Sequence, residues 1–216
     1  MLLLKTAQRS KLDLADDALF YDQPRFVTHV DENFIDQLTQ LYRDRLRPEM
    51  QILDLMSSWV SHLPGELKFA RVEGHGLNAE ELAKNPRFDQ YFVQNLNQNQ
   101  TLPCAEGHFD AVLITVSVQY LEQPEAVFAE IYRILKPGGV VIVSYSNRMF
   151  YQKAIEAWRD GSEKSRVALV ERYFSNAGFT RIETIAKVSS QPPMLQLFGF
   201  GSSDPFYATI GYRDAV

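Results

Sequence analysis

Polar side chains stand at or just after the ends of two apolar, strand-like segments. Asp54 lies near the end of the first segment and Ser57 and Ser58 follow that segment, while Ser117 lies near the end of a later one. Asp54 can order the turn that follows it, and the serine hydroxyls can donate hydrogen bonds to a ligand carboxylate. Trp59 offers a ring face for a flat base or a cation, with simple packing as the alternative. These residue types favour small-molecule binding at the strand ends.

Several other kinds of site are excluded by their missing motifs. The chain has no Gly-x-Ser-x-Gly pentapeptide for a hydrolase nucleophile and no Gly-x-x-x-x-Gly-Lys phosphate loop. Its four histidines do not have the spacing of a helical metal site; they are His29, His62, His75 and His108. We therefore expect no metal centre.

Charge and composition narrow the class of protein further. Lys and Arg total 22 against 27 Asp and Glu, a net charge of −5, and no basic cluster occurs, which disfavours a nucleic acid or an anionic membrane as partner. The single cysteine, Cys104, has no disulfide partner, and no apolar run is long enough for a leader or a membrane span. We expect a soluble, cytoplasmic protein with a small-molecule substrate.

The elements that must position these residues alternate between strand and helix from residue 49 onward. The predicted strands cover residues 51–56, 67–73, 90–96, 109–118, 140–145, 180–188 and 206–212. Asn78, with Glu81 three residues on, can cap a helix that Pro86 ends. Further helices are predicted over 124–135, 149–158 and 163–177. The fourth strand is apolar on both faces, as a central parallel strand must be.

The first 48 residues are predicted to form a part separate from the strand-helix domain. Apolar residues recur at helical spacing from Phe34 to Leu46, Thr28 can cap this helix with Asp31 three residues on, and Pro48 stops it. An irregular arm through Tyr21 precedes it. We predict two parts, an arm and capping helix over 1–48 and a domain over 49–216.

The pattern predicts an α/β fold of the Rossmann-like, doubly wound kind, with three αβα layers. The sheet is expected to have seven mostly parallel strands. The last two strands are joined by a loop too short and too broken for a crossover helix, with Pro192, Pro193, Gly199 and Gly201. They should therefore form an antiparallel hairpin.

Three motifs carry a resemblance to a known family. They are Ile52-Leu53-Asp54-Leu55 in the first strand, Leu102-Pro103 ahead of Phe109-Asp110-Ala111-Val112, and Arg133-Ile134-Leu135-Lys136-Pro137-Gly138-Gly139 before the fifth strand. With the closing hairpin, they make residues 28–215 resemble the class I S-adenosylmethionine-dependent methyltransferases, and among them the type 11-like, small-molecule and quinone subgroup. The resemblance implies S-adenosylmethionine as cofactor and direct methyl transfer to a small molecule.

The same resemblance assigns positions to a cofactor site whose motifs are degenerate. The family's Gly-x-Gly-x-Gly falls on Met56, Ser58 and Val60, its ribose-binding acid on Gly76, and its adenine-binding acid on Asn95. The implied cofactor residues are Asp54, Met56, Ser57, Ser58, Trp59, Gly76, Leu77, Asn78, Asn95, Leu96 and Ser117. Without the acid we expect weak cofactor binding, tightened by Gly76→Asp.

Substrate residues are expected where the arm and the ends of strands four and five meet. The candidates are Tyr21, Arg25, Gln119, Tyr120, Asn147 and Arg148, with His29 as a candidate base. A surface or capping role is the alternative for His29, and an electrostatic anchor for the arm is the alternative for Arg25.

Two other functions remain open. Gly74-x-Gly76-x-x-Ala79 matches a dinucleotide-binding fingerprint, which favours a nucleotide-binding oxidoreductase. The lost glycines and acid favour a non-catalytic binding or scaffold protein that keeps the methyltransferase fold. Calorimetry with the methyl donor and with nicotinamide cofactors separates the three.

Overall fold

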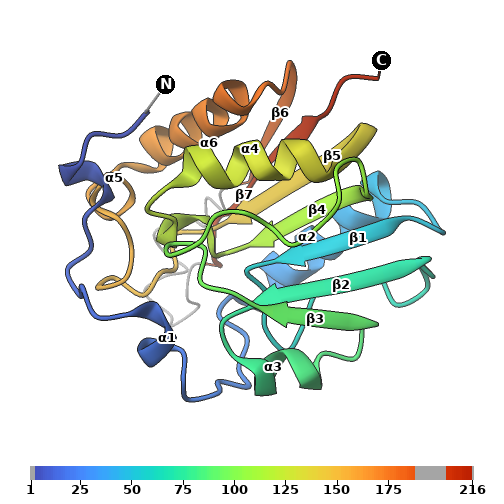
Figure 1. The fold of residues 1–216 in the computed structure, drawn as a ribbon, viewed down its shortest axis with the longest axis horizontal. Coiled ribbons are helices and arrows are strands. Elements are labelled where there is room, and N and C mark those ends of the chain that lie inside the picture. The colour runs from blue at the N-terminus through green and yellow to red at the C-terminus, as the bar shows by residue number, and fades with distance from the viewer. Residues whose placement is uncertain (1–2, 188–202, 216) are drawn as a thin grey trace, which may run out of the picture.

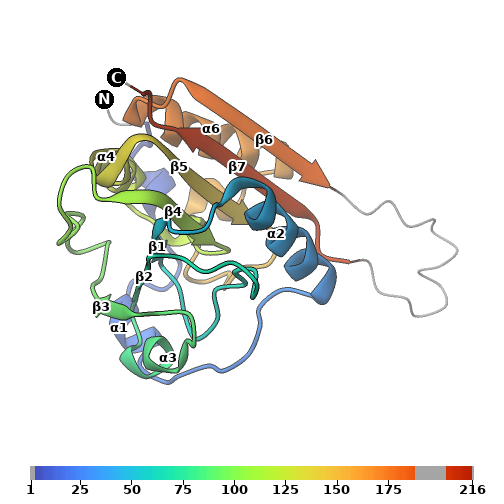
Figure 2. The same cartoon turned by 90° about the vertical axis from the view of Figure 1, so that its right-hand side faces the viewer.

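The computed structural model describes residues 3–187 and 203–215 of the chain. A single seven-stranded sheet has the order β3-β2-β1-β4-β5-β7-β6 (Figure 1). Its strands are β1 Gln51–Leu55, β2 Arg71–Gly76, β3 Gln90–Val93, β4 Phe109–Thr115, β5 Leu135–Tyr145, β6 Arg181–Lys187 and β7 Phe206–Tyr212. The first five are parallel, while β7 is antiparallel to both of its neighbours (Figure 2). The predicted doubly wound sheet with a closing hairpin is confirmed.

Helices cover both faces of the sheet. They are α1 Asp17–Phe20, α2 Glu32–Arg45, α3 Ala79–Lys84, α4 Pro124–Ile134, α5 Glu156–Arg159 and α6 Glu163–Ala177, with short 3-10 turns at Ala7–Arg9 and Val118–Tyr120. In Figure 1, α4 and α6 lie in front of the sheet and α2 behind it. The three-layer prediction is confirmed.

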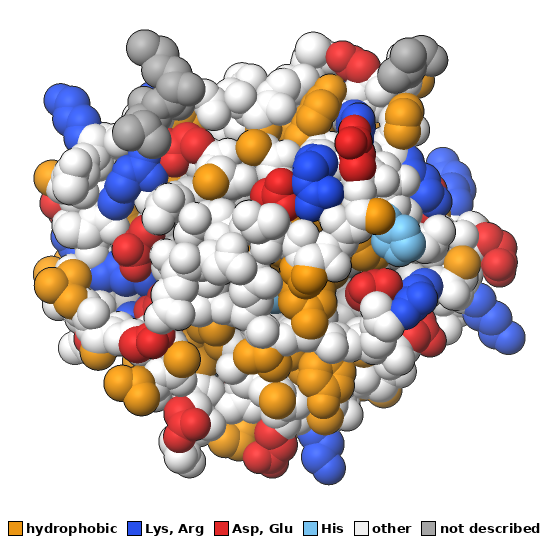
Figure 3. Space-filling view, viewed as in Figure 1, with side chains coloured by type: hydrophobic (Ala, Val, Ile, Leu, Met, Phe, Trp, Pro, Cys, Tyr) orange, Lys and Arg blue, Asp and Glu red, His pale blue; other side chains and the backbone are white. Residues whose placement is uncertain are grey.

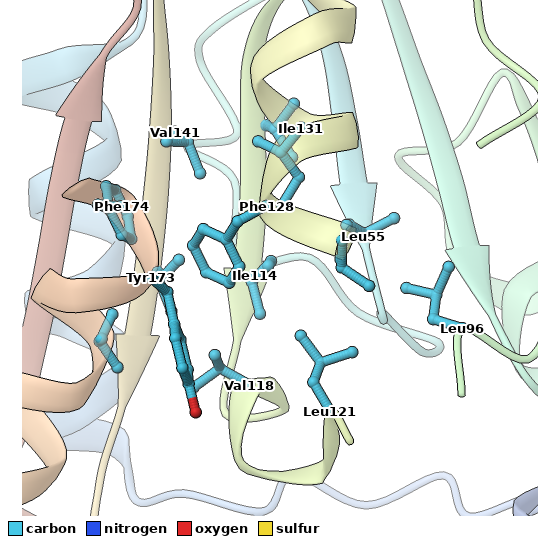
Figure 4. Close-up of a cluster of buried hydrophobic side chains, with 14 of the residues drawn as sticks. Leu55, Leu96, Ile114, Val118, Leu121, Phe128, Ile131, Val141, Tyr173 and Phe174 are labelled. Carbon is cyan, nitrogen blue, oxygen red and sulfur yellow. The ribbon is translucent and has the colours of Figure 1, made fainter. Parts of the chain in front are cut away.

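Alternate residues of the central strands build two hydrophobic cores. Ile114 of β4 and Val141 of β5 meet Phe128 and Ile131 of α4 (Figure 4), whereas Leu113 points to the other face, toward α2. The α4 side chains are fully buried because they recur every three or four residues on one helix face. Burying each such side chain contributes about 1.5 to 3 kcal/mol to folding.

On the face that Figure 3 shows, Lys and Arg side chains are scattered among Asp and Glu side chains. In the part of the chain that the structure describes, no helix is long and apolar enough to cross a membrane.

The helix predicted over 149–158 is wrong except for α5 at its end. The Gln152 carbonyl accepts hydrogen bonds from the amides of Leu12 and Asp13, and the Glu156 amide donates to the Ser10 carbonyl. The N-terminal arm therefore takes the backbone groups that a helix would have used. This competition is non-local, so the sequence pattern did not reveal it.

Element ends also differ from the predictions. Helix α2 is capped by Asp31, whose side chain accepts from the Phe34 amide, and not by Thr28. Strand β2 begins at Arg71 and not at residue 67. Before it, the Glu49 amide donates to the Lys68 carbonyl and the Ala70 amide donates to the Met50 carbonyl. Gly178 ends α6 at a φ of 104°, directly after the predicted helix 163–177. The predicted loop residues Pro192, Pro193, Gly199 and Gly201 lie outside the described residues.

Candidate functional site

A cavity of about 320 Å³ opens at the carboxyl ends of the neighbouring parallel strands β1 and β4, where the strand order switches direction, with β2 and β3 on one side and β5 on the other. Ligands of doubly wound folds bind at this switch point. The loops after β1, β2, β3 and β4 and the segment after β5 form its wall, together with the N-terminal arm from Asp17 to Val30. The predicted convergence of strand ends and arm is therefore present.

The loop after β1 keeps a glycine-like backbone without a glycine. Met56 has a φ of 57°, in the left-handed region, and its amide donates to His75 Nδ1 at 3.0 Å. The Ser57 amide donates to the His75 carbonyl at 2.7 Å. A non-glycine residue in this region costs about 1 to 2 kcal/mol, so these hydrogen bonds hold a strained turn at the cavity.

The end of β2 has no room for a side chain. A Cβ at Gly76 would lie 2.5 Å from the Ser57 carbonyl oxygen and 3.2 Å from Leu82 Cδ2. The position that the resemblance assigns to the ribose-binding acid is thus filled by the main chain of the β1 loop. The expectation that Gly76→Asp tightens binding has to be revised accordingly.

His75 ties three strand ends together. It is 2% exposed, and burial lowers its pKa to about 4. Because Nδ1 accepts from the Met56 amide, Nε2 carries the proton and donates to the Gln94 carbonyl at 2.9 Å. The neutral ring therefore joins the β1 loop, β2 and the end of β3.

Asp54 lies beneath the loop and not on the cavity wall. It is 2% exposed, and burial raises its pKa to about 7 against the opposing hydrogen bonds of Ser61 and Ser57. The Ser57 hydroxyl donates to Asp54 Oδ2 at 2.8 Å. Its position fits the predicted ordering of the loop and does not fit direct ligand contact.

The first turn of α3 links the β1 loop to the arm. Asn78 caps the helix by accepting from the Glu81 amide at 3.0 Å, and its Nδ2 donates to the carbonyls of Tyr21 and Asp22. Glu81 accepts from the Arg25 amide at 2.7 Å and from the Ser58 hydroxyl. The cap prediction for Asn78 is confirmed, and its polar atoms are used within the protein.

Two more predicted cofactor residues use their polar atoms within the protein. Trp59 Nε1 donates to the Val27 carbonyl at 3.2 Å, and its ring meets Phe26 edge-on. Asn95 Oδ1 accepts from the Asn97 amide and its Nδ2 donates to Asp16. Both side chains line the cavity and leave apolar or already bonded surface to a ligand.

The arm side of the cavity is aromatic and includes the guanidinium of Arg25. The Phe150 ring lies 5.3 Å from His29, 6.1 Å from Tyr120 and 5.5 Å from the Arg25 guanidinium carbon. Arg25 Nη2 donates to the Phe20 carbonyl, while Nη1 is buried with no partner among the described residues. This end can take an anionic or hydrogen-bond-accepting group.

The His29 imidazole and the Ser117 hydroxyl also line the cavity and could take part in a reaction. Burial lowers the pKa of His29, so its ring is neutral at pH 7 and can accept a proton. The Ser117 hydroxyl is buried without a partner among the described residues.

Most predicted site residues line the cavity. They are His29, Met56, Ser57, Ser58, Trp59, Gly76, Leu77, Asn78, Asn95, Leu96, Ser117, Tyr21, Arg25, Tyr120 and Arg148. Three do not: Asp54 lies below the loop, Gln119 turns inward and donates to the Val116 carbonyl, and Asn147 is exposed outside the wall. In the described ranges, no cluster of His, Cys, Asp and Glu has the arrangement of a metal site.

Sequence reasoning missed other residues of the wall. They are Asp17, Val27, Thr28, Val30, Val60, His62, His75, Glu81, Gln94, Asn97, Thr115, Val116, Met149 and Phe150. Most of them flank a predicted strand end or His29, so a wider window at each strand end would have found them. Glu81 was missed because its cap position already explained it.

The comparisons with known proteins agree with this fold. Residues 66–143 match the family model described as a methyltransferase domain, a range that begins after the β1 loop. The biotin biosynthesis bifunctional protein BioHC of Teredinibacter turnerae is 28% identical over 111 residues, 51% of this chain and 18% of that protein. The ubiquinone/menaquinone biosynthesis C-methyltransferase UbiE of Shewanella piezotolerans is 27% identical over 107 residues, 45% of this chain and 43% of that protein. The chain thus spans less than half the length of these relatives.

Solved structures share the fold at lower identity. The [4+2]-cyclase SpnF has a TM-score of 0.61 at 15% identity, covering 84% of this chain and 82% of that one. Phosphoethanolamine N-methyltransferase 2 of Haemonchus contortus, in complex with S-adenosyl-L-methionine, has a TM-score of 0.55 at 15% identity, with 84% and 52% covered. In its fold and in the matched segment 66–143, the chain is similar to the class I S-adenosylmethionine-dependent methyltransferases.

Proposed function

We propose that the chain is an S-adenosylmethionine-dependent methyltransferase that transfers a methyl group directly to a small molecule. The observation that carries this proposal is the 320 Å³ cavity at the switch point of a class I sheet, in a chain whose segment 66–143 matches a methyltransferase domain. The relatives include a C-methyltransferase of quinone biosynthesis, which supports a small acceptor.

The residues of the cavity wall can hold a nucleoside methyl donor, although the glycine loop and the ribose-binding acid of the family are missing. Leu77 and Leu96 offer apolar side chains at the ends of β2 and β3 for a flat base. Ser117 brings an unpartnered buried hydroxyl, which can donate to a carboxylate of the methyl donor. Gly76 contributes no acceptor, so the hydroxyl groups of a ribose must find one elsewhere.

When bound, the donor supplies an electrophilic methyl group on a positively charged sulfur. The protein's task is then alignment and water exclusion. The rings of Tyr21, Tyr120 and Phe150 would enclose the acceptor, and Arg25 would hold an accepting group on it. The neutral His29 imidazole can take up a proton from the acceptor if one is released.

Titration calorimetry with S-adenosylmethionine and S-adenosylhomocysteine tests the proposal. We expect both to bind, and reduced nicotinamide cofactors to give no heat. Absence of binding at millimolar ligand would instead support the scaffold reading, and binding of the nicotinamide alone would support an oxidoreductase. A third outcome, binding of the product without turnover on any acceptor, would fit a different chemistry on this fold, as in the [4+2]-cyclase.

The setting of this reaction stays a prediction. The single cysteine and the net charge of −5 favour a reducing, cytoplasmic location and disfavour a nucleic-acid partner.

A further inference from the structure

Two carboxylates line the cavity, and they differ in their partners. Asp17 lies 2.6 Å from Lys11 Nζ and 3.4 Å from Lys153 Nζ. Glu81 is only 7% exposed, yet in residues 3–187 and 203–215 no Lys, Arg or His side chain lies within ion-pair distance of it. A buried carboxylate without a cation is costly unless hydrogen-bond donors surround it.

The donors that Glu81 has within the protein leave part of its capacity free. Oε1 accepts from the Arg25 amide at 2.7 Å, and Oε2 accepts from the Ser58 hydroxyl. A carboxylate has about four acceptor positions, so each oxygen can take one more donor. The carboxylate sits between the β1 loop and the arm, on the wall of the cavity. Two open acceptor positions on one rigid group match two adjacent hydroxyl groups.

Other positions on this wall do not offer such an acceptor pair. The Ser57 carbonyl fills the space above Gly76, Asp54 lies below the loop, and Asp17 is neutralised by lysines. Leu77 and Leu96 add apolar surface on the same wall. We infer that Glu81 binds the vicinal diol of a nucleoside, through one hydrogen bond to each carboxylate oxygen.

This inference rests on the proposed function only for the identity of the nucleoside, so it is tested with several ligands. The wild-type chain, Glu81→Gln and the matched control Glu80→Gln, an exposed glutamate of the same helix turn, are titrated by calorimetry. The ligands are S-adenosylhomocysteine, S-adenosylmethionine, adenosine and 2′-deoxyadenosine. Thermal unfolding of each variant checks that it is folded.

We expect Glu81→Gln to lower the affinity for S-adenosylhomocysteine and for adenosine about 10- to 100-fold, since each hydrogen bond loses its charged acceptor. Glu80→Gln should bind as the wild type does. For 2′-deoxyadenosine the loss caused by Glu81→Gln should be several-fold smaller, because one hydroxyl is missing in both proteins.

Other results would overturn the inference. Equal affinity of Glu81→Gln and Glu80→Gln for S-adenosylhomocysteine would leave the proposed function standing and remove Glu81 from the site. Glu81→Gln could also lower the affinity for S-adenosylmethionine much more than the affinity for S-adenosylhomocysteine, which lacks the sulfonium charge. That result would mean that Glu81 pairs with the sulfonium and not with the diol. Binding of adenosine without S-adenosylmethionine would sink the proposed function alone, and no nucleoside binding would sink both.

A crystal structure of the wild-type chain with S-adenosylhomocysteine gives a reading that needs no variant. Both Glu81 oxygens should lie about 2.5 to 3.0 Å from the two ribose hydroxyl oxygens. A ribose that faces any other acceptor would contradict the inference even if Glu81→Gln failed to fold.

Discussion

Two residues beside the cavity hold backbone conformations that their side chains disfavour. Met56 has a φ of 57° after β1, and Val116 has a φ of 44° after β4. For a β-branched residue such as Val116 this is a genuine outlier, and outliers of this kind concentrate at binding sites. The surrounding hydrogen bonds, including those of the Val116 amide to the Ser144 carbonyl and of Gln119 to the Val116 carbonyl, over-determine the turn. The chain thus keeps the shape of a glycine loop with other residues.

Gly76→Asp should destabilise the protein and should not improve binding of the methyl donor. The new Cβ would meet the Ser57 carbonyl, whose movement would disturb the hydrogen bond from the Ser57 amide to the His75 carbonyl. Overpacking of this kind costs about 1 to 3 kcal/mol, measurable by urea unfolding. Gly65→Ala is the control, because nothing lies within 4 Å of its Cβ. A Gly76→Asp protein of unchanged stability would contradict the geometry.

Asp54 should make the protein less stable as the pH rises. Its folded pKa of about 7 lies above the unfolded value near 3.8, so the native state holds the proton more tightly between these two pH values. Relative to Asp54→Asn, the free energy of unfolding of the wild type should fall from pH 4 to pH 8, by roughly 4 kcal/mol at most. Urea unfolding across this range measures the difference. A difference that does not change with pH would mean that Asp54 is ionised normally.

At the scale of elements, the sequence predicted most of the sheet but not the β1 loop. β4 was identifiable because it is apolar on both faces, and the α3 cap because Asn78 and Glu81 have local spacing. The loop was not, because its shape depends on hydrogen bonds to His75 in the neighbouring strand. Local patterns report helix periodicity and caps, whereas contacts between loops carry no such signature.

The contribution of His75 to the stability of the protein should be lost in acid. Its folded pKa of about 4 lies below the unfolded value near 6.5, so its contribution is fully present above pH 6.5 and is lost as the pH falls through about 4. Relative to His75→Gln, the free energy of unfolding of the wild type should fall by about 3 kcal/mol between pH 6.5 and pH 4. This slope is opposite to that of Asp54, so each variant is compared with the wild type separately. If the two proteins kept the same difference throughout, the buried neutral ring would be refuted.

At the scale of the whole molecule, the N-terminal arm completes the cavity and is held by buried charges. Lys153 is fully buried, and its Nζ lies 3.0 Å from Asp13, 3.4 Å from Asp17 and 2.7 Å from the Ala15 carbonyl. Nearer the N-terminus, Arg9 pairs with Glu125 of α4 at 2.6 Å. The arm therefore depends on the α/β body, and the division at residue 48 stays a prediction about the chain's organisation.

Lys153→Met should release the arm. Methionine matches the length of the lysine stem but leaves Asp13 without its cation and Asp17 with Lys11 alone. Removing one partner of a buried ion pair costs about 3 to 5 kcal/mol, whereas Glu66→Gln, in the exposed pair with Arg43, should cost less than about 1 kcal/mol. Hydrogen exchange should show faster exchange across residues 11–21 in Lys153→Met only. Because Tyr21, Arg25 and His29 reach the cavity from this arm, the affinity for S-adenosylhomocysteine should fall with the lost protection. An arm that exchanged no faster would show that the apolar contacts of Phe20 and Phe150, and not the buried charges, hold it in place.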